Sequence, residues 1–190
     1  MQEEAAAAKT TARGIPPISI PGGLLLLFCL FLPAVKGCDK PVYPYEIPVA
    51  YAPYLFGLLA AALGVLRSGR AAKVLRTLTW ALSSIAALAE GYFFVSGLKT
   101  NNHAELRFLV PALLLWVPLT INLLESVRWR EKAQLWRALL LSNGGGLCLL
   151  FFLFFTAIER VYYGMWLSIL GSACVLVEGV LCWHSLRRKA

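Results

Sequence analysis

Charged and chemically reactive side chains are scarce in this sequence. Charged residues make up 15% of the 190 positions, against roughly 25% in an ordinary soluble domain. Asp39 is the single aspartate, and His103 and His184 are the only histidines. One aspartate excludes a metal centre built on paired aspartates. The two histidines fall on opposite sides of the membrane in the topology derived below, which excludes a shared metal or haem site and a Ser-His-Asp triad.

Catalytic and cofactor motifs are also missing. The sequence contains no HExxH, no CxxC and no glycine-rich phosphate loop between a strand and a helix. We therefore expect no metal and no cofactor, and we favour a non-enzymatic function over an enzymatic one. An enzyme acting on lipid would have to rely on a few intramembrane carboxylates and asparagines, and it ranks third among the functions considered.

Apolar residues are abundant instead. They make up 59% of the chain, against roughly 45–50% in soluble domains, and the mean hydropathy is +0.68. A soluble domain could not bury so many apolar residues and still present a charged surface. The net charge is +8, but the basic residues lie in short clusters between long apolar runs, as membrane orientation requires. The sequence therefore predicts an integral membrane protein in contact with the lipid bilayer and without a nucleic-acid partner.

Six apolar segments divide the chain. A spanning helix needs about 20 residues, because each residue rises about 1.5 Å through a hydrocarbon core of roughly 30 Å. The sequence predicts an all-α, polytopic transmembrane helix bundle over residues 21–186. Its six helices are expected at residues 21–35, 47–66, 77–98, 108–127, 138–158 and 161–184. A flexible cytoplasmic tail is expected at residues 1–20 and a basic cytoplasmic tail at 187–190.

The first segment is the shortest of the six. Prolines at 16, 17 and 21 discourage a helix before Pro21, which leaves only residues 21–35. This length also suits the apolar part of a cleaved signal peptide, although we favour an uncleaved helix. The sequence VKGC resembles the lipobox of bacterial lipoproteins, which implies lipidation at Cys38. Gly37 and Val35 fit that pattern, whereas Lys36 departs from it.

The distribution of basic residues predicts the orientation. The connections after the second and fourth segments and the chain end carry eleven Lys and Arg residues, and the opposite side carries three downstream of the second segment. The positive-inside rule places the eleven in the cytoplasm, together with both termini. The cytoplasmic set comprises Arg67, Arg70, Lys73, Arg76, Arg128, Arg130, Lys132, Arg137, Arg187, Arg188 and Lys189.

Glu90 and Glu178 are the two carboxylates inside predicted spans. An ionisable group in a bilayer is a functional candidate by default. Each lies on a helical face of small residues, which lets helices approach closely and directs both carboxyls into the bundle. Low dielectric there favours the neutral, hydrogen-bond-donating form. The two interpretations are proton handling or substrate coordination, and interhelical hydrogen bonding to a serine or a carbonyl; we favour the second.

A second group of candidates lies toward the cytoplasmic side. Asn122 and Asn143 lie roughly 9 Å from the nearest basic anchor, and Glu178 roughly 14 Å, at about 1.5 Å per residue. Gly144, Gly145 and Gly146 follow Asn143 and permit the fifth helix to kink or unwind. One interpretation is a polar cavity in this layer, because broken helices line transporter sites. The alternative is a close helix crossing that needs glycine.

These features predict a small multi-pass membrane protein that acts as an accessory or assembly component. It is expected in the cell membrane or an inner membrane, with the bilayer and a membrane-protein partner as its contacts. The alternative is a small proton-coupled transporter that uses Glu178 and Glu90 with a glycine-broken fifth helix.

Overall fold

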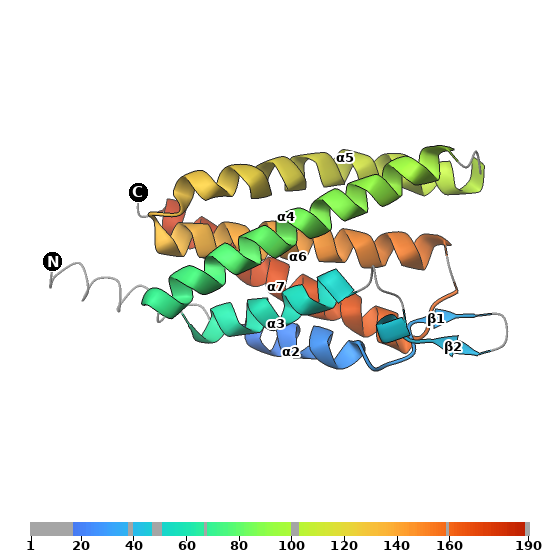
Figure 1. Ribbon diagram of the computed structural model, residues 1–190, viewed down its shortest axis with the longest axis horizontal. Coiled ribbons are helices and arrows are strands. Elements are labelled where there is room, and N and C mark those ends of the chain that lie inside the picture. The colour runs from blue at the N-terminus through green and yellow to red at the C-terminus, as the bar shows by residue number, and fades with distance from the viewer. Residues whose placement is uncertain are drawn as a thin grey trace, which may run out of the picture.

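The computed structural model describes residues 17–37, 40–46, 51–66, 68–99, 103–158 and 160–188 (Figure 1). This part of the chain is almost entirely helical, which confirms the predicted all-α class. The helices are α2 (Ser19–Cys29), α3 (Tyr51–Val65), α4 (Arg70–Lys99), α5 (His103–Glu125), α6 (Ala133–Ile158) and α7 (Tyr163–Arg187), with short 3-10 turns η1 (Pro44–Glu46) and η3 (Ser126–Trp129).

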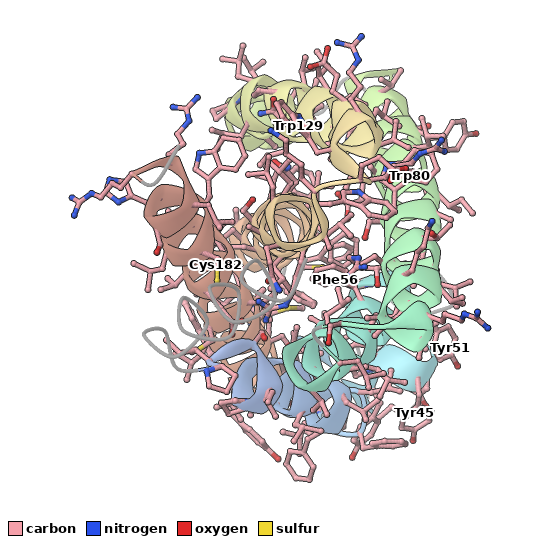
Figure 2. All side chains as sticks on the ribbon, turned by 90° about the vertical axis from the view of Figure 1, so that its left-hand side faces the viewer. Tyr45, Tyr51, Phe56, Trp80, Trp129 and Cys182 are labelled. Atoms are coloured by element: carbon pink, nitrogen blue, oxygen red, sulfur yellow. The ribbon has the colours of Figure 1, made fainter. Side chains whose placement is uncertain are left out.

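Helix α6 is the centre of the bundle. Viewed along the bundle, α7, α2, α3, α4 and α5 follow one another around α6, and each packs against the next (Figure 2). The ring is open between α5 and α7. In the most apolar stretch of each long helix, the buried share is 72% for α6, 22% for α5 with η3 and 39% for α7. A central helix that is apolar on all sides is expected to be buried in this way.

Large apolar side chains cover the outside of the ring. Each outer helix exposes several of them, including Phe28 on α2, Leu58 on α3, Ile85 on α4, Leu114 on α5 and Leu170 on α7. In water such a surface would be an aggregation liability, whereas in lipid it is the ordinary outer face of a helix bundle. The exposed side chains therefore agree with a membrane environment.

Three helical stretches are long and apolar enough to span a bilayer, over the residues that the structure describes. They are Leu109–Trp129, Ala133–Ala157 and Tyr163–Arg187, and α2 and α3 are shorter apolar helices. Three such stretches support a membrane protein with transmembrane helices. The six-span prediction is met for these three.

The bounds of several observed helices differ from the predicted ones. The first helix is not at residues 21–35: it begins at Ser19 and ends at Cys29, and Val35 lies in a strand. Pro21 lies in the first turn, where its missing N–H group breaks no helical hydrogen bond. The third and fifth helices begin at Arg70 and Ala133 rather than at 77 and 138, because the polar residues that precede an apolar stretch also belong to the helix.

The two ends of the bundle differ. The start of α4, the turn from α5 to α6 and the end of α7 bring the described members of the three basic clusters to one end, here called the basic end (Figure 1). The other end carries a small antiparallel hairpin of β1 (Val35–Lys36) and β2 (Pro41–Val42), which the sequence did not predict. A bridge between Val35 and Val161 joins this hairpin to the connection between α6 and α7.

Candidate functional site

A buried ion pair between Arg137 and Glu178 is the most highly charged feature of the bundle interior. Arg137 lies in the second turn of α6 and Glu178 on the inner face of α7, and their side chains are 4% and 1% exposed. The Arg137 guanidinium donates through Nη2 to Oε1 of Glu178. A buried pair of this kind is stable only when additional hydrogen bonds satisfy the remaining polar atoms.

The additional bonds come from the ends of two other helices. The backbone N–H of Ser19, the first residue of α2, donates to Glu178 Oε2 at 2.5 Å. Arg137 Nε donates to the carbonyl oxygen of Leu63, in the last turn of α3, at 2.9 Å. The first N–H groups and last carbonyls of a helix lack partners within the helix, and they carry partial positive and negative charge. The carboxylate therefore caps the positive end of α2, and the guanidinium caps the negative end of α3.

Glycine contacts bring these four helices together. A Cβ atom at Gly22 would lie 2.8 Å from the carbonyl oxygen of Gly171, so α2 and α7 approach at backbone distance. A Cβ at Gly179, next to Glu178, would lie 2.3 Å from the backbone nitrogen of Ser142 on α6. Small residues permit such approach between membrane helices. The predicted inward face of α7 is present, with Val175 buried on the same side.

The predicted role of Glu178 as a neutral hydrogen-bond donor was wrong. It accepts hydrogen bonds from a guanidinium and from a backbone N–H, which the ionised carboxylate does best. The reason is Arg137, which was expected in the cytoplasmic connection and lies inside α6. The sequence contained one indication of this position. Arg137 lies between Trp136 and a long apolar run, so a helix that begins one turn earlier than predicted places Arg137 among apolar residues.

A second polar feature is a cavity of about 300 Å³ at the basic end, between α5 and α7, which we call the α5–α7 cleft. Its floor is the face of α6 that the open ring leaves uncovered, and Trp129, labelled in Figure 2, lies at its edge. The predicted residues Asn122 and Asn143 both line it, whereas Glu178 and the three glycines do not. The polar and aromatic lining comprises Asn122, Glu125, Ser126, Trp129, Ser142, Asn143 and Trp183.

The glycine run does not break its helix, which supports the close helix crossing over the alternative of a kinked or unwound helix. Helix α6 is continuous from Ala133 to Ile158. Gly144 faces the ring of Phe56 on α3, Gly145 faces the backbone of Leu176 on α7, and Gly146 faces Leu119 on α5. Consecutive residues of a helix point about 100° apart, so three glycines permit close contact with three different neighbours. The geometry is that of close helix crossings.

Glu90 lies apart from the ion pair, between α3, α4 and α6. It is 6% exposed, and its Oε2 atom has no hydrogen-bond partner among the residues that the structure describes. It borders a cavity of about 10 Å³, together with Ser83 and Cys148, which is the size of one water molecule. The Ser83 hydroxyl also lacks a partner within the described ranges. The wall of this small pocket is apolar, and the pocket is separate from both the ion pair and the cleft.

The remaining candidates add no metal centre. Groups of three or more His, Cys, Asp or Glu side chains that could hold a metal ion are absent from the described part of the chain. Cys38, the predicted lipidation site, lies outside the described residues. The chain matches no protein-family model, no curated protein and no solved structure.

Proposed function

We propose that this chain is a non-enzymatic accessory or assembly component of a cell or inner membrane, with its basic end in the cytoplasm. The ion pair between Arg137 and Glu178 carries this proposal. A carboxylate that moves protons or binds substrate must exchange its partners during each cycle. Glu178 is instead held by a guanidinium and by the first N–H group of α2, in a position that is 1% exposed. Its charge joins helix ends rather than facing a cavity.

The rest of the interior supports a static bundle. Glycines bring α2 against α7 and α6 against α7 at backbone distance, which leaves little room for the relative sliding that alternating access requires. Tryptophan side chains fix α4 to α5: Trp80 Nε1 donates to the Leu123 carbonyl oxygen and Trp116 Nε1 donates to that of Ala87, each at 3.0 Å. A rigid bundle of this size suits a protein that holds or completes a larger membrane assembly.

The proposal is tested by proton flux and by co-purification. Wild-type protein and the Glu178→Gln and Glu90→Gln variants are reconstituted in liposomes that contain a pH-sensitive dye, and all three should match protein-free liposomes. Purification from the native membrane in mild detergent should then yield a stoichiometric membrane-protein partner. The partner should be retained by Arg130→Met, which alters an exposed arginine, and lost with Arg137→Met. Proton flux that the Gln variants abolish would contradict the accessory role.

A proton-coupled carrier remains the second candidate, on one observation. Glu90 is buried beside a cavity of one water molecule, and its Oε2 is unpartnered among the described residues, as in a group that exchanges a proton. The carrier was also expected to use Glu178 and a broken fifth helix. Glu178 is held in an ion pair and α6 is continuous, so neither feature supports a carrier. Under this alternative, Glu90→Gln abolishes proton flux and Glu178→Gln reduces only the amount of folded protein.

A further inference from the structure

The α5–α7 cleft is rich in hydrogen-bond acceptors. The Ser126 hydroxyl donates to the Leu123 carbonyl oxygen at 2.6 Å, and the Ser142 hydroxyl donates to the Leu139 carbonyl oxygen at 3.2 Å. The Asn143 amide nitrogen donates to the same Leu139 oxygen at 3.0 Å. The two hydroxyl donors and one amide N–H of Asn143 are thus engaged with backbone, which leaves the serine and asparagine oxygens as acceptors. A ligand that supplies hydrogen-bond donors can bond to these oxygens.

A carboxylate adds negative charge to these acceptors. Glu125, the last residue of α5, lines the cleft and forms no salt bridge with any residue in the described ranges. The indole rings of Trp129 and Trp183 also line the cleft, and aromatic faces attract cations. The carboxylate and the oxygen acceptors together favour a primary ammonium group, which carries one positive charge and three donors.

Two cationic side chains lie over the indole rings at the cleft. Lys132 Nζ lies 5.4 Å from the ring centre of Trp129, and the guanidinium carbon of Arg187 lies 5.2 Å from that of Trp183. The cleft therefore combines an acceptor-rich interior with two cations beside its aromatic residues. A ligand that fits both parts carries an ammonium group and an anionic group a few bonds apart, as phosphoethanolamine does.

We propose that the α5–α7 cleft binds the phosphoethanolamine headgroup of a membrane aminophospholipid. Glu125, Asn143 and the neighbouring hydroxyl oxygens accept hydrogen bonds from the ammonium group, and Lys132 and Arg187 interact with the phosphate. This inference goes beyond the accessory role and does not depend on it.

The lipid is favoured over a soluble amine by the apolar surface around the cleft. Val180 lines the cavity and is half exposed, and Leu181 beside it on α7 is equally exposed. On α5, Ile121 and Leu124 are exposed to a similar degree. Acyl chains that continue from the headgroup would cover these side chains. The bilayer already contacts these side chains, so the headgroup of a neighbouring lipid can enter the cleft while its acyl chains stay in the bilayer.

The test is a binding titration with lipids labelled on an acyl chain. Phosphatidylethanolamine, phosphatidylcholine and phosphatidylglycerol are each titrated into detergent-solubilised wild-type protein, and phosphatidylethanolamine should bind tightest. Glu125→Gln should weaken its binding about threefold to tenfold, as expected for a partly exposed charge-assisted hydrogen bond. Glu131→Gln is the matched control, because Glu131 is an exposed neighbour that pairs with Arg130 and does not line the cleft.

Further outcomes decide the inference. Glu125→Lys should reverse the headgroup preference toward phosphatidylglycerol, with circular dichroism confirming that the variant is folded. Soluble glycerophosphoethanolamine should compete at least a hundredfold more weakly than the intact lipid. Equal binding of the three headgroups, a preference of the wild type for phosphatidylglycerol, or equal effects of Glu125→Gln and Glu131→Gln would overturn the proposal. Equal competition by the soluble headgroup would overturn the assignment to a lipid.

Discussion

Exchanging the two buried charges, by Arg137→Glu together with Glu178→Arg, should destabilise the bundle although an ion pair is kept. In the wild type, the carboxylate accepts from the Ser19 N–H group and the guanidinium donates to the Leu63 carbonyl oxygen. After the exchange, a donor faces the N–H group and an acceptor faces the carbonyl. Each reversed contact removes a charge-assisted hydrogen bond and opposes the partial charge of a helix end.

The size of the effect follows from these contacts. A hydrogen bond to a charged group contributes about 1.5–3 kcal/mol, so reversing both contacts should lower the free energy of unfolding by about 3–6 kcal/mol. Arg137→Met, which leaves the Glu178 carboxylate unpaired, should lower it by about 3–5 kcal/mol. Arg137→Lys keeps the charge but loses the planar arrangement of donors, and it should cause a smaller loss of about 1–3 kcal/mol.

The assay is reversible unfolding in mixed micelles with increasing dodecyl sulfate, followed by tryptophan fluorescence and circular dichroism. Arg130→Met is the control, because Arg130 pairs with Glu131 at the surface, where their side chains are 65% and 79% exposed. It should change the free energy of unfolding by less than about 1 kcal/mol. An exchange variant as stable as the wild type would refute the reasoning, because the pair would then act through its mutual attraction alone.

Three further predictions use the same unfolding assay. Gly23→Ala should destabilise the protein by about 1–3 kcal/mol, because the added Cβ would lie 2.2 Å from the Gly57 carbonyl oxygen on α3; an unchanged midpoint would show that α2 and α3 are not in close contact. Trp116→Phe should lower the free energy of unfolding by about 0.5–1.5 kcal/mol, because it removes the hydrogen bond to the Ala87 carbonyl oxygen. An unchanged free energy of unfolding would show that the indole N–H does not form this bond. Glu90→Met should raise stability by about 1–3 kcal/mol, because it removes a buried oxygen without a partner among the described residues; a loss instead would reveal a bound group.

The local pattern of apolar and small residues was enough to predict the all-α fold class and the helix faces that point into the bundle. Ser83, Ala87 and Glu90 share one face of α4, and all three are buried, because helical periodicity fixes which residues share a face. The same argument located Glu178 on the inner face of α7. The predicted helices also overlap the observed ones, since long apolar stretches identify helices independently of their partners.

What the sequence could not decide was which groups meet across helices. Arg137 and Glu178 are 41 residues apart, and Ser19 and Glu178 are 159 apart, so no local spacing connects them. An arginine near a helix end extends into solvent or pairs inside the bundle according to the neighbours that packing supplies. The α5–α7 cleft likewise exists because the ring around α6 is open there. Helix periodicity is a property of single segments, whereas pairing and cavities are properties of their arrangement in three dimensions, which only the tertiary structure decided.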